Sequence, residues 1–193
     1  MNDTKNIKVL HYFNYGYLKR YSGHTIRWVR IFESWSDSRI THLTIDQENY
    51  KIISATSNRA ITHVDDKILT KIKMHLGNLS QILVVIRDRD LFQVIHLHTI
   101  HWGGLLLILI SKFINKPVLF ESTLYGSDDP NSIGRERLGG LKTWIMKKLN
   151  AVIVVSPQLA DEYGKFGIPY LILNNPVFSN VFKPVKNETQ KNT

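Results

Sequence analysis

Three histidines lie close together in the segment 96–102, which reads His-Leu-His-Thr-Ile-His-Trp. His96 and His98 are two residues apart, so in a strand their side chains point to the same face of the sheet. With His101 they carry ring nitrogens of the kind that bind a zinc ion. No carboxylate lies nearby in the sequence to complete a ligand set, so we expect no metal here. Instead, His98, His101 and Trp102 are expected to bind a sugar or a polar headgroup, because an aromatic face and hydrogen-bonding rings suit such ligands.

Backbone N–H groups at two expected helix starts offer a different chemistry, the binding of an anion. Ser22 and Gly23 precede the first expected helix, and small residues there let phosphate oxygens reach the backbone N–H groups. Ser156 followed by Pro157 is a specific helix start, which caps its helix whether or not an anion binds. An ordinary cap is the alternative at both positions, because the sequence contains neither a glycine-rich dinucleotide-binding motif nor a P-loop.

A polar, glycine-containing loop follows another expected strand. It covers residues 121–130 and reads Glu-Ser-Thr-Leu-Tyr-Gly-Ser-Asp-Asp-Pro. Ligands of an open parallel sheet bind beyond the carboxyl ends of its strands, so this loop is placed to form one wall of a site. Taken alone it is a turn, and its interpretation depends on the neighbouring segments.

Strand-like and helix-like segments alternate along the chain, and they must position these loops. Strands are expected at 8–13, 40–45, 94–98, 117–120, 151–155 and 170–173. Helices are expected at 23–35, 65–76, 79–86, 103–114, 138–149 and from 157 to about 164, with Gly77 and Asn78 between the second and the third. The alternation predicts an α/β fold, and apolar strands such as 151–155 favour a Rossmann-like parallel sheet with helices on both faces.

Composition limits the class of protein and its partners. The chain has 193 residues, of which 43% are hydrophobic and 21% charged, as in a globular protein of one domain. A net charge of +9 favours an anionic partner. Nucleic acid is the least expected partner, because the sequence has no nucleic-acid motif and no concentrated run of Lys or Arg. The absence of cysteine excludes disulfides and thiolate chemistry, and no apolar run approaches the ~20 residues of a membrane span.

Six segments, taken in order, resemble the N-terminal half of retaining glycosyltransferases of the GT-B fold, and more narrowly the glycosyltransferase family 4-like N-terminal domain. They are the Ser22-Gly23 turn, Val-Ile-His-Leu-His at 94–98, Lys-Pro-Val at 116–118, Thr-Leu-Tyr-Gly-Ser-Asp at 123–128, Asn-Ala-Val-Ile-Val-Val-Ser at 150–156, and the stretch 175–184. Gln93 replaces an acid of the family pattern, and Phe178 replaces an Asp. We therefore expect one Rossmann-like domain over residues 1–184 and a disordered polar tail over 185–193.

The resemblance implies transfer of a sugar from a nucleotide sugar to a saccharide or lipid-linked acceptor, in polysaccharide, lipopolysaccharide or glycolipid biosynthesis. It implies that this half binds the acceptor, that no metal or other cofactor takes part, and that a second domain, in cis or in trans, binds the nucleotide sugar. The residues it implies for acceptor binding are His98, His101, Trp102, Tyr125, Gly126 and Asp128, and Ser22 and Gly23 would contact the donor phosphate. Tyr125 stands where many relatives have a histidine near the reacting sugar, which makes it the candidate catalytic residue.

The expected second domain leaves alternatives for what this chain does. Because the chain ends where that domain would begin, we expect the chain alone to bind nucleotide weakly and to show no turnover. It would then be one subunit of a split glycosyltransferase, or a non-catalytic carbohydrate- or membrane-binding module. In either case we expect exposed aromatic residues at the carboxyl edge of the sheet, where a partner would cover them. These residues are Tyr15, Tyr17, Trp102 and Tyr125.

Basic residues lie on or beside the helix expected at 138–149, and these are Arg135, Arg137, Lys142, Lys147 and Lys148. Its apolar stripe of Leu138, Leu141, Ile145 and Leu149 is expected to pack on the sheet, which leaves the basic residues outside. They form either a solvated face or an attachment to anionic lipid, where a lipid-linked acceptor would be found. We accordingly expect a cytoplasmic protein, peripheral to the inner face of the membrane if this attachment exists.

Overall fold

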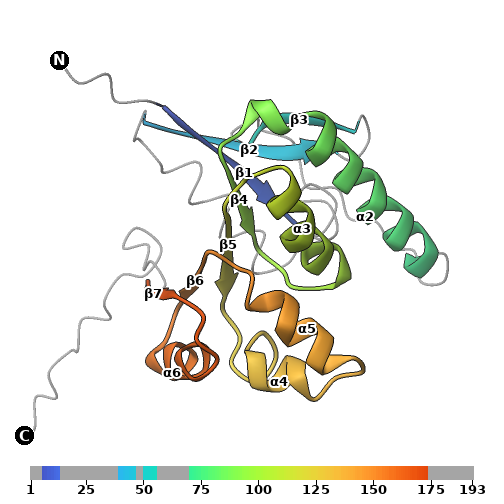
Figure 1. Ribbon diagram of the computed structural model, residues 1–193. Coiled ribbons are helices and arrows are strands. Elements are labelled where there is room, and N and C mark those ends of the chain that lie inside the picture. The colour runs from blue at the N-terminus through green and yellow to red at the C-terminus, as the bar shows by residue number, and fades with distance from the viewer. Residues whose placement is uncertain (1–5, 14–38, 47–49, 56–69, 174–193) are drawn as a thin grey trace, which may run out of the picture.

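Seven strands form a single sheet in the order β3-β2-β1-β4-β5-β6-β7 (Figure 1). The computed structural model describes residues 6–13, 39–46, 50–55 and 70–173. The strands are β1 (Ile7–Tyr12), β2 (Ile40–Asp46), β3 (Lys51–Ser54), β4 (Val94–Leu97), β5 (Val118–Ser122), β6 (Ala151–Val154) and β7 (Tyr170–Ile172). Neighbouring strands are parallel except β2 and β3, which are antiparallel. This arrangement confirms the expected α/β, Rossmann-like class, and β3 is a strand that the sequence pattern did not predict.

The strand order changes direction at β1, which pairs with β2 on one side and with β4 on the other. In an open α/β sheet such a reversal opens a crevice at the carboxyl ends of the two strands, where ligands bind. The carboxyl ends of β1, β4 and β5 lie at the same edge because the three strands are parallel. The loops after β4 and β5, which the sequence pattern placed at the carboxyl ends of their strands, therefore lie beside this switch point.

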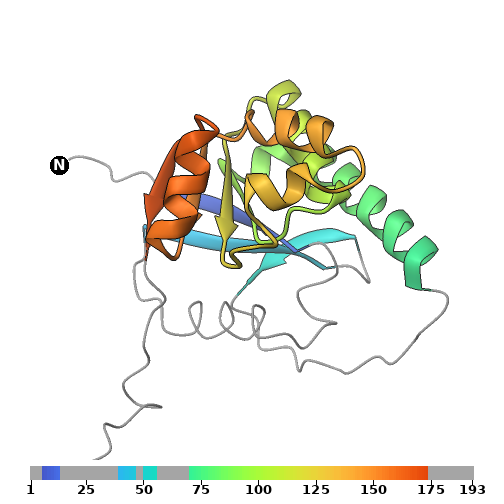
Figure 2. The same ribbon diagram turned by 90° about the horizontal axis from the view of Figure 1, so that it is seen from below.

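The helices are α2 (Thr70–Arg87), α3 (Trp102–Phe113), α4 (Pro130–Gly134), α5 (Gly139–Met146) and α6 (Pro157–Lys165), with a 3-10 turn at Arg89–Leu91. Figure 2 shows α2, α3 and α5 on one side of the strands. Parallel strands that follow one another in the same direction across a sheet are joined by right-handed crossovers, which bring their helices to one face. The predicted start of α6 is confirmed, because the Ser156 hydroxyl accepts a hydrogen bond from the backbone N–H of Leu159 at 3.4 Å.

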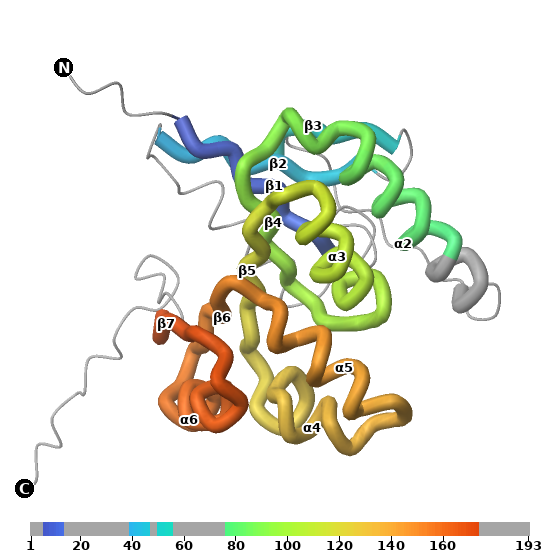
Figure 3. Tube along the Cα trace, in the orientation of Figure 1, coloured from blue at the N-terminus to red at the C-terminus, as the bar shows by residue number. Residues whose placement is uncertain are grey.

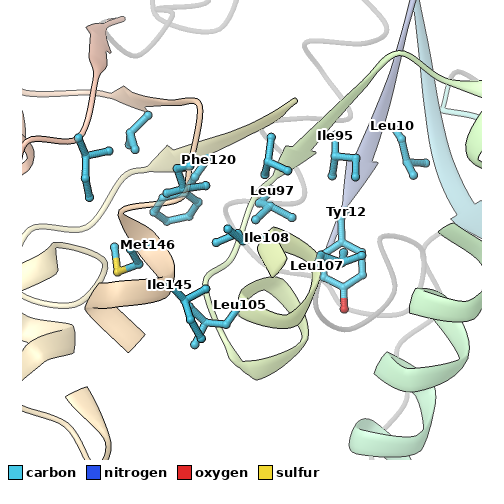
Figure 4. Packing of buried hydrophobic residues seen from close by; sticks show 14 of the residues in the cluster. Leu10, Tyr12, Ile95, Leu97, Leu105, Leu107, Ile108, Phe120, Ile145 and Met146 are labelled. Atoms are coloured by element: carbon cyan, nitrogen blue, oxygen red, sulfur yellow. The ribbon is translucent and has the colours of Figure 1, made fainter. Parts of the chain in front are cut away.

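The hydrophobic core fills the space between these helices and the sheet. Leu10 and Tyr12 of β1, Leu97 of β4 and Phe120 of β5 are fully buried. They belong to one hydrophobic cluster with Leu107 and neighbouring residues of α3 (Figure 4). Since successive side chains of a strand alternate between faces, the residues between these positions must lie on the opposite face of the sheet. That opposite face carries the polar residues described below.

The helix α2 differs from the sequence expectation in its length and in the face it buries. It continues through Gly77 and Asn78, because one glycine costs a helix only about 1 kcal/mol. The helical spacing of Leu79, Ile82, Leu83 and Ile86 predicts that these four share one buried face. This prediction is wrong at Leu79 and Leu83, which are 50% and 59% exposed, whereas Val85 is fully buried. The described part of α2 lies beside α3 (Figure 3), and Leu79 and Leu83 lie on a face of this helix that is exposed among the described residues.

The helix expected at 138–149 is shorter and turns part of its apolar stripe outward. It is α5, which begins at Gly139 after Leu138 adopts a left-handed backbone conformation with φ of 62°. Ile145 and Leu149 are buried as predicted, but Leu138 and Leu141 are 57% and 47% exposed, so the expectation for these two is wrong. The helix packs mainly against α3 and α4. Two leucines thus join the basic residues on the outer surface.

Candidate functional site

Five polar side chains from four neighbouring strands gather on the face of the sheet opposite the hydrophobic core. His11 of β1 lies beside His96 of β4 in the strand register. His98 and Glu121 lie two residues beyond the paired residues His96 and Leu119, so they share this face. His42 of β2 is the register partner of Val9, which lies two residues before His11 on the same face, so His42 joins them. We call this group the histidine cluster, and its members are His11, His42, His96, His98 and Glu121.

The histidine cluster is buried, with exposed fractions of 1% for His11 and Glu121, 3% for His98, 4% for His96 and 9% for His42. Burying polar groups costs several kcal/mol unless they find hydrogen-bonding partners or bind a ligand. The cluster also lies at the carboxyl ends of β1 and β4, at the switch point of the sheet. Its position and its burial both distinguish it from an ordinary set of surface histidines.

A chain of hydrogen-bonding contacts runs through the histidine cluster. His42 Nδ1 lies 2.9 Å from His11 Nε2, and His11 Nδ1 lies 2.8 Å from His98 Nε2. At the end of the chain, His98 Nδ1 lies 3.1 Å from Glu121 Oε2. The rings of His11 and His98 are stacked with centroids 5.1 Å apart. The ring of Phe13 stacks on that of His98, with centroids 4.3 Å apart.

One arrangement of protons satisfies all three contacts at once. His98 donates from Nδ1 to the Glu121 carboxylate, so its Nε2 is left to accept the hydrogen bond that His11 donates from Nδ1. The Nε2 of His11 then accepts from the Nδ1–H of His42. The carboxylate at one end therefore sets the tautomer of each ring along the chain.

Burial favours the neutral form of two of these rings, His11 and His42. It lowers the pKa of His11 well below the usual 6.5, and the nearby His98, His96 and His42 lower this pKa further. Burial also lowers the pKa of His42. A neutral imidazole has one nitrogen with a lone pair, and this nitrogen can accept a hydrogen bond or bind a metal ion.

The structure separates the histidines that the sequence pattern grouped together. His98 is inside the histidine cluster, whereas His101 is exposed at the start of α3 and Trp102 is 43% exposed beside it. The amino group of Lys142 lies 5.2 Å from the centre of the Trp102 ring. His101 and Trp102 are thus open to a ligand at the carboxyl edge, and the buried His98 lies beneath them.

The loop after β5 presents Tyr125 on an ordered turn. The carboxylate of Asp128 accepts hydrogen bonds from the backbone N–H groups of Thr123 and Leu124 at 3.4 and 3.3 Å. Gly126 has φ of 84°, a conformation that favours glycine. Tyr125, which lies between Leu124 and Gly126, is 65% exposed. Of the residues predicted in this loop, Tyr125 is available to a ligand, while the side chain of Asp128 holds the turn.

Asp129 fixes the same loop to α4. Its carboxylate accepts hydrogen bonds from the backbone N–H of Gly126 at 2.7 Å and from the backbone N–H and hydroxyl of Ser132 at 2.9 and 2.7 Å. Burial would raise the pKa of Asp129, but these hydrogen bonds outweigh it and the pKa is lowered. The hydroxyl of Tyr163 on α6 donates to the backbone oxygen of Asp128 at 2.7 Å. The loop is therefore held from α4 and α6 together.

Other predicted residues lie outside the described residues. These are Ser22 and Gly23 of the phosphate-binding prediction, Tyr15 and Tyr17 of the aromatic edge, and the tail 185–193. Among the described residues, no helix combines the length and the apolar character needed to cross a membrane.

Three members of the histidine cluster, His11, His42 and Glu121, were not predicted as site residues from the sequence. The signal was present in the alternation of the first strand, where Val9, His11 and Phe13 share one face. What the sequence could not supply was the pairing of β1 with β4, which brings residues 85 positions apart side by side.

No model of a known protein family matches the chain, and no curated protein matches it. The functional assignment therefore depends on the residues and on their geometry.

Proposed function

We propose that the chain is the acceptor-binding half of a retaining glycosyltransferase of the GT-B class. It binds a saccharide or lipid-linked acceptor at the carboxyl edge of the sheet. A second domain, in the same protein or in another polypeptide, holds the nucleotide sugar and completes the reaction. The proposal combines the resemblance of six sequence segments with the Rossmann-like fold.

One observation carries the proposal. Trp102 and Tyr125 are exposed side chains on loops that follow the adjacent parallel strands β4 and β5, next to the switch point of the sheet. Aromatic faces stack on the apolar faces of sugars, and the Tyr hydroxyl can exchange hydrogen bonds with a sugar hydroxyl. The crevice at such a switch point is where an α/β sheet binds its ligand.

Basic residues of α5 and of the loop before it would suit an anionic acceptor such as a saccharide on a lipid diphosphate, although the charge of Lys142 is paired with Glu136. Lys142 lies over the ring of Trp102 and belongs to α5, so α5 adjoins the proposed acceptor site. On α5, Trp144 is 52% exposed, and the amino group of Lys148 lies 4.1 Å from the centre of its ring. Exposed tryptophan next to basic residues is typical of a surface that rests on anionic lipid.

We call this area the α5 surface, and it comprises Arg135, Arg137, Leu138, Leu141, Trp144, Lys147 and Lys148. The two leucines that α5 turns outward give it the apolar part that insertion into a lipid interface needs. We propose that the α5 surface brings the acceptor edge to the membrane that carries the lipid-linked acceptor.

Acceptor binding by the purified chain tests the proposal directly. Saccharides and short-chain lipid-linked saccharides would be titrated into 15N-labelled protein, and the amide shifts followed by nuclear magnetic resonance. Shifts are expected at 99–104 and 123–127, and Trp102→Ala or Tyr125→Ala should weaken binding about three- to tenfold, the worth of one aromatic contact. Tyr125→Phe separates the contribution of the ring from that of the hydroxyl.

Phe113→Ala is the matched control. Phe113 is the last residue of α3, 88% exposed, and about 16 Å along the helix axis from Trp102. This variant should bind the acceptor as the wild type does. If Trp102→Ala and Phe113→Ala bind equally well, the acceptor site is not at this edge.

Transfer itself is tested in cells from which the chain is deleted. Loss of labelled-sugar transfer from a nucleotide sugar to the acceptor is expected, with recovery by the wild type and by Phe113→Ala but not by Tyr125→Ala. Unchanged transfer in the deleted cells, together with intact saccharide binding, would instead indicate a non-catalytic binding module.

A further inference from the structure

We propose that the histidine cluster is a binding site for a divalent first-row transition metal ion, with His11, His96 and His98 as its ligands and Glu121 behind them. This inference does not depend on the proposed glycosyltransferase function. It departs from the expectation of no metal, which considered only ligands close together in the sequence.

Convergence of the ligand atoms is the first argument. One ring nitrogen from each of His11, His96 and His98 lies within 4.8 Å of the others. Two nitrogens bound to one tetrahedral zinc ion at its usual bond length are about 3.3–3.4 Å apart. The 2.8 Å contact between His11 Nδ1 and His98 Nε2 would therefore open by roughly half an ångström when an ion replaces the shared proton.

The sheet itself fixes this convergence. His11 and His96 are register partners on adjacent parallel strands, and His98 is the next residue on the same face. Ring centroids are 5.2 Å apart for His11 and His96 and 4.3 Å apart for His96 and His98. Ligands held on paired strands cannot drift apart without breaking the ladder, so the site is preformed.

The contact between His98 and Glu121 is of the kind that supports metal-binding histidines. Such a histidine usually donates its other ring N–H to a carboxylate, which fixes the tautomer and makes the ligating nitrogen more basic. The Nδ1 of His98 faces Oε2 of Glu121 at 3.1 Å, which leaves Nε2 directed toward His11. Glu121 is 1% exposed, so this carboxylate is built into the site.

His42 provides the corresponding partner for His11. When an ion takes the lone pair of His11 Nδ1, the proton of this ring moves to Nε2 and is donated to His42 Nδ1, 2.9 Å away. The proton that His42 carried on Nδ1 then lies on its own Nε2. Every ring stays neutral, and no net proton is released by these three rings.

The ligand set also indicates which ion would bind. Three imidazoles without a thiolate suit zinc, copper, nickel or iron rather than magnesium or calcium, which prefer oxygen ligands. Three protein ligands leave one coordination position for water or another group. An ion in this site would tie β1 to β4 at the base of the switch-point crevice.

Zinc binding to the full chain tests the proposal. Chelator-treated protein would be titrated with Zn²⁺ in competition with a chromophoric chelator, and Co²⁺ would report the geometry through its visible absorption. We expect one ion per chain, an absorption typical of tetrahedral cobalt, and a rise in the melting temperature with Zn²⁺ but not with Mg²⁺. Binding well below one ion per chain, or an octahedral cobalt spectrum, would overturn the proposal.

Variants locate the ion. His98→Asn should weaken zinc binding at least tenfold, and Glu121→Gln, which preserves size, should weaken it about 10- to 100-fold. His101→Asn is the matched control, because His101 is an exposed histidine three residues from His98 and should not affect binding. Equal affinity in all of these proteins would show adventitious binding elsewhere on the chain and refute the site.

A measurement on the wild-type protein covers the case in which a variant fails to fold. Zinc should shift the ring 15N resonances of His11, His96 and His98 in histidine-labelled protein and leave His101 unchanged. Shifts at exposed histidines without shifts at these three would contradict the inference.

Discussion

Gly104→Ala tests whether the connection between the histidine cluster and the acceptor edge is as tightly packed as the structure indicates. Gly104 lies in the first turn of α3, directly after the loop that follows His98. A Cβ atom added to Gly104 would lie 2.6 Å from the backbone oxygen of Thr99. Because a backbone atom cannot rotate away, the loop or the helix must shift.

A matched glycine isolates the cost of this contact. Gly140 occupies the first turn of α5, and a Cβ atom there meets nothing within 4 Å. Both substitutions gain helix propensity of up to about 1 kcal/mol, whereas only Gly104→Ala incurs an overpacking cost of about 1–3 kcal/mol. The free energy of unfolding should therefore differ between the two variants by about 1–3 kcal/mol, with Gly140→Ala the more stable.

Thermal and urea unfolding measure this difference. For a protein of this size, 1 kcal/mol shifts the melting temperature by about 2–4 °C, so the two variants should differ by about 2–12 °C. Gly104→Ala should also shift the amide resonances of 99–102, because the loop moves. Equal melting temperatures for the two variants would refute the close approach of α3 to the loop.

Three further outcomes follow from other contacts. Asp129→Asn should lower stability at pH 7 by about 1 kcal/mol through the lost cap of α4. Because the folded state lowers the pKa of this carboxyl, the gap to wild type should shrink as pH falls below about 3.9 and be lost as pH falls through the lowered pKa of the folded state; a pH-independent gap in urea unfolding would contradict this. Lys147→Glu with Lys148→Glu should weaken sedimentation with anionic vesicles at least about tenfold at low salt, while neutral vesicles show no change; equal binding to both kinds of vesicle would disprove lipid attachment by the α5 surface. Tyr163→Phe should cost about 1–2 kcal/mol and loosen 123–129 in hydrogen exchange, whereas unchanged protection would show that its hydroxyl does not hold the loop.

Much of the fold was predictable from local patterns. The alternation of apolar strands with amphipathic segments gave the α/β class, and Ser156 followed by Pro157 gave the start of α6, because caps and periodicity act over a few residues. The same local rules failed for α2, where they marked Leu79 and Leu83 as buried. Which face of a helix is covered depends on its neighbours and not on its own sequence alone.

Of the residues predicted at the acceptor edge, some lie there in the structure and one does not. Trp102 and Tyr125 were predicted there because loops after parallel strands must share one edge of the sheet. His98 was predicted there too, but it lies beneath this edge, since its place in the strand alternation turns it to the face opposite the core.

The sequence by itself determined that His96 and His98 lie on one face of their strand, and that His11 shares a face of the first strand with Val9 and Phe13. Only the tertiary structure places His11 on the same face of the sheet as His96 and His98. The pairing of β1 with β4 depends on how the whole chain covers its apolar residues, a long-range choice that no window of sequence contains. That choice brings His11 to His96 and His98, adds Glu121 from β5, and turns scattered polar residues into a single buried cluster.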